Sequence, residues 1–170
     1  MANSIIQLSP ELLRMLENTL SPSVLSTILT EWGQLYRAEM LERFEVLTRG
    51  GSEWPYLRFV RPRNRVAGTV DPRQQNILWD EGFLVGSLQP EIGLAENNGG
   101  RQEIHGRSVT IGFAKTIKHK RSRLTVQAIA DKHQGGMGVP QRRILVPPSD
   151  ELIQTMLEWA QEAILNGEVK

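Results

Sequence analysis

The segment that decides the fold covers residues 21–51 and reads SPSVLSTILTEWGQLYRAEMLERFEVLTRGG. Its serine and proline are typical of a helix start, because a hydroxyl can cap the first turn and proline suits the first helical position. Apolar side chains then recur at helical spacing, and they are Leu25, Ile28, Leu29, Trp32, Leu35, Tyr36, Met40, Phe44 and Leu47. Gly50-Gly51 ends the pattern. We therefore predict one long amphipathic helix, in which Gly33 costs about 1 kcal/mol relative to alanine and can mark close packing.

A shorter helix is expected before the long one. Ser9-Pro10-Glu11 repeats the serine and proline start and adds an acid in the positively charged first turn. We expect this helix to end near Leu20. Residues 1–50 are therefore interpreted as a helical N-terminal part.

The rest of the chain, residues 51–170, mixes strand and helix patterns. Residues 61–75 read RPRNRVAGTVDPRQQ and predict a mobile loop, because they are polar and lack apolar periodicity. Residues 88–92 and 102–113 alternate as strands do, around the turn-rich residues 96–100. We predict a long antiparallel hairpin there, with a second mobile loop near residues 95–101.

Three further elements are expected toward the C-terminus. Residues 124–134 predict a helix ended by Gly135-Gly136, and residues 143–146 predict a strand. A last helix is expected over residues 149–165, before Asn166-Gly167. Helices, a hairpin or small sheet and a final helix define an α+β fold, which we assign to a single domain over residues 1–170.

Composition limits the classes of protein that fit. The chain has 170 residues, 39% of them hydrophobic, and a formal net charge of only +1, which disfavours a dedicated nucleic-acid binder. It has no cysteine, which excludes disulfides, cysteine-bound zinc and thiol nucleophiles. No stretch approaches the roughly 20 apolar residues that span a bilayer, and the N-terminus has no signal-peptide pattern. We expect a soluble protein made in the cytoplasm, with no membrane partner.

The sequence offers little material for catalysis, so we do not expect an enzyme, a cofactor or a metal site. His105, His119 and His133 have no metal-binding spacing and are interpreted as surface or packing residues. The acids Asp150 and Glu151 fit the first turn of the last helix without a catalytic role.

Two groups of residues are candidates for binding. Two basic stretches could follow a DNA backbone or meet an acidic partner, or could be ordinary solvated surface: Arg61, Arg63, Arg65 and Arg73, and then Lys115, Lys118, Lys120, Arg121 and Arg123. Large apolar side chains in short segments either form a partner surface or close one core, and they are Trp54, Tyr56, Leu57, Trp79 and Phe83.

Three short blocks in order resemble the phage virion morphogenesis proteins, the group that includes tail-completion and neck proteins of Mu-like and P2-like phages. The first reads GSEWPYL at residues 51–57 and the second LWDEGFLVGSL at residues 78–88. The third, the most specific, reads AIADKHQG at residues 128–135, followed by VPQR at residues 139–142. Departures at Glu81, and at Arg143-Ile144 where the family has proline and phenylalanine, leave the subgroup open.

The resemblance implies a small α+β subunit that forms a ring, expected to be a hexamer, in the virion. Its partners would be further copies of itself and other neck, connector or tail-tube proteins, with genomic DNA passing through the lumen. It would be assembled in the host cytoplasm. Beside the aromatic residues above, the candidate interface positions are His133, Pro140 and Arg142, and we interpret Arg142 as an anchor rather than a ligand site.

Three alternatives stay open at this stage. A head-side connector and a tail-side terminator both need a ring, and the sequence does not separate them. A DNA-binding or regulatory accessory protein would use the basic stretches 61–73 and 115–123. An enzyme would have to bring together His105, His133, Asp80 and Glu103, which are scattered along the chain.

Overall fold

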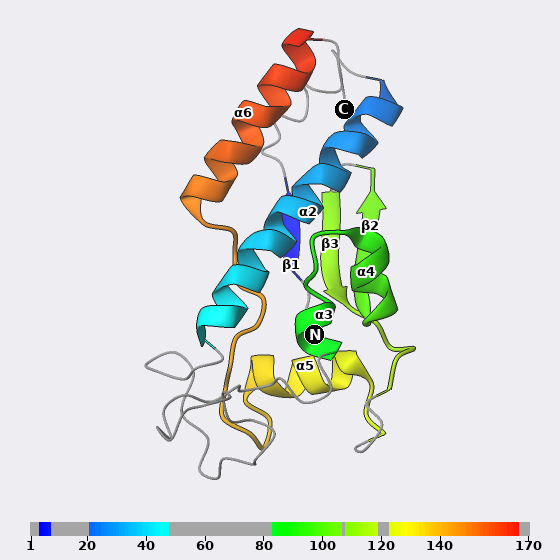
Figure 1. The fold of residues 1–170 in the computed structure, drawn as a ribbon, viewed down its shortest axis with the longest axis vertical. Coiled ribbons are helices and arrows are strands. Elements are labelled where there is room, and N and C mark those ends of the chain that lie inside the picture. Colours follow the sequence, from blue (N-terminus) through cyan, green and yellow to red (C-terminus); the bar gives the residue numbers. More distant parts are fainter. Residues whose placement is uncertain (1–3, 8–20, 48–82, 107, 119–122, 167–170) are drawn as a thin grey trace, which may run out of the picture.

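The computed structural model describes residues 4–7, 21–47, 83–106, 108–118 and 123–166. Within them the chain is α+β, as the sequence predicts: a long helix packs on a small antiparallel sheet, and shorter helices complete the core (Figure 1). The predicted helix at residues 9–20 and the predicted loop at residues 61–75 lie outside the described residues, as does Gly50-Gly51.

The long helix α2 (Pro22–Leu47) is confirmed, and its buried face is the predicted one. The spacing of about four residues places Ile28, Trp32, Tyr36, Met40 and Phe44 in one stripe, each 0–2% exposed. Gly33 is also buried, and the Gln102 side chain packs against it so closely that a Cβ at position 33 would overlap the Gln102 amide. The close-packing role considered for Gly33 is therefore the one it has.

The sheet has three strands in the order β1-β3-β2, with β1 at Ser4–Gln7, β2 at Gly100–His105 and β3 at Ser108–Phe113. Both outer strands run antiparallel to β3. Val109, Ile111 and Phe113 of β3 are 0–1% exposed, because strand alternation turns all three toward α2 and the core. The same alternation turns the other side of β2 away from α2.

The predicted hairpin is correct in kind but wrong in position. Residues 88–92, expected as its first strand, form turns and the start of helix α4 (Ile92–Asn97). Residues 95–101, expected as a loop, are the last turn of α4 and the start of β2, where Ala95, Gly99 and Gly100 are buried. The residues expected as one strand, 102–113, contain the true hairpin, which turns after His105 at Gly106, with a φ of +55°.

The two C-terminal helices agree with prediction because their ends carry local signals. Helix α5 (Val126–Gly135) begins where the Thr125 hydroxyl accepts the Ala128 N–H at 3.1 Å, and ends at Gly136 in the left-handed region. Helix α6 (Asp150–Asn166) begins where the Ser149 hydroxyl accepts the Leu152 N–H at 3.1 Å. Ile153, an apolar residue of α6, is 41% exposed.

The helices occupy distinct sides of the sheet. Helix α2 lies across one sheet face, α6 runs alongside α2, and α5 lies across the end of the sheet near the short helix α3 (Phe83–Gly86) (Figure 1). The Trp32 indole N–H donates to the Met156 carbonyl at 3.1 Å and joins α2 to α6. None of the described helices is long and apolar enough to cross a membrane.

Candidate interaction surfaces

The end of α5 is attached to the segment that follows it by a single side chain, Gln134. Its Oε1 atom accepts the backbone N–H groups of Ile144 and Leu145 at 2.7 and 3.2 Å, and its Nε2 atom donates to the Leu145 carbonyl at 2.6 Å. This is the pattern of donors and acceptors that a neighbouring strand would offer. The predicted strand at residues 143–146 is therefore wrong, because the chain bends at residues 144–145 and bonds there to a glutamine side chain rather than to another strand.

The same junction contains His133 and Arg142 of the third resembling block, and it buries Arg142. The Arg142 backbone N–H donates to the His133 carbonyl at 2.7 Å, and the Arg142 Nη1 atom reaches the Pro140 carbonyl at 3.4 Å. The Arg142 residue is 3% exposed, and burial lowers its pKa. Burial, and then the charge of Arg142, lower the pKa of His133 to about 4. His133 is therefore neutral at pH 7, and Arg142 binds within the chain as an anchor does.

Side chains of helix α2 also contact the segment that follows α5. The Tyr36 hydroxyl donates to the Val146 carbonyl at 2.7 Å, and the Arg43 Nη1 atom donates to the Arg143 carbonyl at 2.7 Å. At the start of α6, the Ser149 N–H donates to the Glu39 carboxylate at 3.3 Å. Side chains of α2 and α5 thus position residues 143–149 between the two helices.

Arg37, on the core face of α2, is an unusual buried charge. It is 0% exposed, and within the described part of the chain its Nε, Nη1 and Nη2 atoms are buried without a hydrogen-bond partner. Burial lowers its pKa, and the negative charge of Glu96 on α4 opposes that shift. A guanidinium that lacks a close counter-charge in the core costs free energy, so Arg37 should make the fold less stable than an apolar residue of similar size would.

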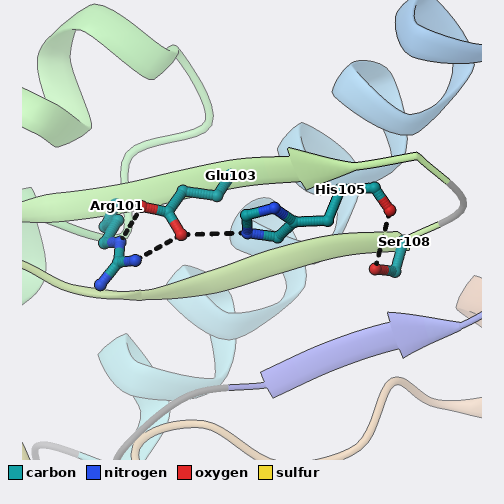
Figure 2. Close-up of polar contacts among 4 residues, drawn as sticks. All are labelled: Arg101, Glu103, His105 and Ser108. Atoms are coloured by element: carbon teal, nitrogen blue, oxygen red, sulfur yellow. Dashed lines mark hydrogen bonds and ion pairs between the residues drawn. The ribbon is translucent and has the colours of Figure 1, made fainter.

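The face of β2 that points away from α2 carries a row of charged side chains, which we call the β2 ladder: Arg101, Glu103 and His105 (Figure 2). The Arg101 Nε atom donates to Glu103 Oε1 at 2.6 Å, and the His105 Nε2 atom lies 3.1 Å from Glu103 Oε2. The hydrogen bond from Arg101 lowers the pKa of Glu103 and raises that of Arg101. The three side chains are 43%, 37% and 62% exposed, so the ladder is available to a partner.

The second basic stretch is only partly described. Lys115, Lys118 and Arg123 are exposed, and Arg123 has a φ of +57°, an uncommon conformation for a residue with a side chain. The stretch is anchored in the fold by the bridge between Lys118 and Thr125. Lys120 and Arg121 lie outside the described residues, as do Arg61, Arg63, Arg65 and Arg73.

The candidate aromatic surface cannot be assembled from the described residues. Trp54, Tyr56, Leu57 and Trp79 lie outside them. Phe83 is half-buried at the start of α3 and packs against the core, which was the alternative to a partner surface at this position. Pro140 is exposed, His133 is half-buried, and no group of three or more metal-binding side chains occurs in the described ranges.

Sequence reasoning missed Arg37, Gln102 and the role of Gln134. The burial of Arg37 could have been predicted, because Arg37 lies one helical turn after Gly33 and beside Tyr36 on the buried side of the helix. Gln134 stands inside the third resembling block, but its partners at residues 144–145 depend on how the chain folds back. No local pattern predicts the pairing of Gln102 with the helix backbone, where its Nε2 atom donates to the Thr30 carbonyl at 3.3 Å.

The fold defines a class: an α+β protein whose small antiparallel sheet is covered by one long helix and carries a charged outer face. Comparison of the chain with protein-family models, with curated proteins and with solved structures yields no match in any of the three.

Proposed function

We propose that this chain is a structural protein of a tailed-phage virion that forms a ring at the neck or at the head-proximal end of the tail, in tail completion, tail termination or head–tail joining. One observation carries the proposal. In the described part of the chain the sheet has two outer strands, β1 and β2, each paired with β3 alone, and one charged face that no described helix covers. A ring needs two different patches on each subunit, and two unlike strand edges meet that requirement.

The resembling blocks support this proposal by their place in the fold. The end of the second block forms α3 and the turn after it, where Leu84 and Leu88 are 5% and 1% exposed. The third block forms the junction held by Gln134 and Arg142. Both blocks therefore carry residues that maintain a fold, as expected of a structural subunit.

The test is the solution mass of the purified chain by light scattering across concentration, together with negative-stain imaging. A closed ring with a central hole near the width of duplex DNA, about 20 Å, is the expected result. The chain with Arg142→Ala should lose the ring if the junction shapes the contact surface, and Lys132→Ala, on the exposed side of α5, is its control. Particles that never exceed a few subunits at any concentration would contradict a self-assembling ring.

A second candidate function, a DNA-binding accessory protein, is favoured by the exposure of Lys115, Lys118 and Arg123. Its test is binding to a short labelled duplex at two salt concentrations, with a variant in which all three residues are alanine. Binding through phosphates weakens steeply with salt, and the triple variant should lower both the affinity and the salt dependence. Equal binding by the variant would remove this candidate.

A further inference from the structure

The outer edge of β2, the one that is not paired with β3, carries backbone groups directed away from the sheet. His105 and Ser108 are paired across a two-residue turn, and in such hairpins the flanking residues exchange hydrogen bonds. Inward and outward residues alternate from there, so Arg101, Glu103 and His105 bond to β3. The N–H and C=O groups of Gln102 and Ile104 then point outward, and no described strand pairs with them.

We propose that β2 pairs with β2 of a second copy of this chain, antiparallel and centred on Gln102, to give a two-fold dimer with a continuous six-stranded sheet. The order would be β1-β3-β2-β2-β3-β1, from two copies of the observed three strands. In this register the outward backbone groups of Gln102 in each copy face one another and can exchange hydrogen bonds. The proposal does not rest on the virion role, and it competes with a ring built through the β2 edge, because an edge paired with a second β2 is not open to a different patch.

Charge and strand length select this register from those that match the outward groups. Centred on Gln102, the pairing sets Arg101 of each copy opposite Glu103 of the other, which gives two reciprocal pairs of opposite charge. Centred on Arg101 or on Glu103, it would set like charges directly opposite. Centred on Ile104, it would run off the strand, which ends at His105.

The positions of the Arg101 and Glu103 side chains suit these pairs of opposite charge. Arg101 and Glu103 lie on the open face, 43% and 37% exposed, and would meet at a position without backbone hydrogen bonds, where opposing side chains are closest. The Arg101 and Glu103 of one copy already contact each other, so each carboxylate would lie between two guanidinium groups. Charged side chains on an edge strand disfavour pairing with other strands. In this register Arg101 and Glu103 would favour pairing with a second copy of β2.

The experiment is sedimentation velocity across a wide concentration range, because a contact of this length is at the small end of specific interfaces. The wild-type chain is expected to show a concentration-dependent dimer. Arg101→Glu and Glu103→Arg, each tested alone, should weaken it on the order of tenfold or more, since each sets like charges opposite one another. The double variant R101E/E103R should restore it.

An equimolar mixture of the two single variants is the decisive sample. One chain then carries two acids and the other two arginines in the ladder, so the mixed dimer regains both opposite pairs while neither chain regains its own internal pair. Lys132→Glu and Glu162→Arg, on exposed helix surfaces, make the same changes in net charge and should dimerise as the wild type does. A wild-type chain that stays monomeric, or a mixture no better than its components, would overturn the proposal.

The register can be tested separately by disulfide cross-linking, because the chain has no cysteine of its own. Arg101→Cys mixed with Glu103→Cys places two thiols opposite each other at one end of the pair and keeps the Arg101 and Glu103 contact at the other. Oxidation should link the two different chains and not two chains of the same variant, because the Cα separation of such a pair suits a disulfide. Links within each variant alone would contradict this register. A ring in negative stain without these effects would support the virion role and still refute the dimer.

Discussion

At the scale of single residues, Gln134 replaces a strand neighbour for residues 144–145. Glutamic acid at this position keeps the acceptor for the two N–H groups but puts an oxygen where Nε2 now donates to the Leu145 carbonyl at 2.6 Å. We expect Gln134→Glu to lower the free energy of unfolding by about 1–3 kcal/mol, since a buried acceptor loses its donor. Urea denaturation measures this, with Gln161→Glu on the exposed side of α6 as the control. Equal stability of the two variants would refute this role.

Protonation of His133, at the same junction, should make the stability of the fold depend on pH. Its pKa in the fold is about 4, below the ordinary 6.5, so the unfolded chain binds more protons between these two values. Stability should therefore be fully present above pH 6.5 and fall as the pH drops toward 4. Because the His133 imidazole is only half-buried, we expect the free energy of unfolding to fall by about 1 kcal/mol between pH 7 and pH 5. Urea titrations at both pH values test this, and His133→Gln should reduce the difference.

Replacing Arg37 should stabilise the fold, unlike the replacement of Gln134. Methionine can occupy the space of the arginine stem without a charge, so Arg37→Met should raise the free energy of unfolding by about 1–3 kcal/mol. Arg143→Met, at an exposed position, should change it by less than about 0.5 kcal/mol. Thermal and urea unfolding would measure both. A destabilised Arg37→Met would mean that the guanidinium has a favourable partner in solution.

At the scale of elements, prediction succeeded where the signal is local. The ends of α5 and α6 are within two residues of the predicted ones, because Thr125, Ser149 and Gly136 act on their own helix turns. The sheet depends on distant partners: β1 at residues 4–7 pairs with residues 108–111, and its four residues hold no turn or cap. The misplaced hairpin has a different cause: the glycine-rich residues at the end of α4 resemble a hairpin turn, although they end a helix and lead into β2.

The junction of α4 and β2 shows what that Gly-rich stretch does. A Cβ on Gly100 would lie 2.5 Å from the Ser87 carbonyl oxygen and 2.9 Å from that of Ala95, both backbone atoms that cannot move aside cheaply. Gly100→Ala should therefore cost about 1–3 kcal/mol. Gly93→Ala, in α4 with open space around it, should gain about 1 kcal/mol from helix propensity. Thermal denaturation of the pair tests this, and equal shifts would refute it.

At the scale of the whole molecule, α2 connects the sheet to α6 and to residues 143–149. One face packs on β2 and β3, its side chains hold residues 143–149, and α6 runs alongside it (Figure 1). The sequence could predict that α2 is the main helix, because its apolar stripe is long. It could not predict which elements would meet there, since Trp32 and Met156 are separated by most of the chain.

This arrangement predicts that α6 unfolds together with the sheet. Met156 is 2% exposed, and its truncation leaves a cavity between α2 and α6, so Met156→Ala should cost about 2–4 kcal/mol. Tryptophan fluorescence and far-UV circular dichroism should give coincident urea transitions in the wild type and in the variant, both shifted equally. Ile153→Ala, 41% exposed on the same helix, is the control and should cost less than about 1 kcal/mol. If α6 were an independent appendage, Met156→Ala would divide the circular dichroism transition into two steps, because α6 would lose its helix content before α2 and the sheet unfold.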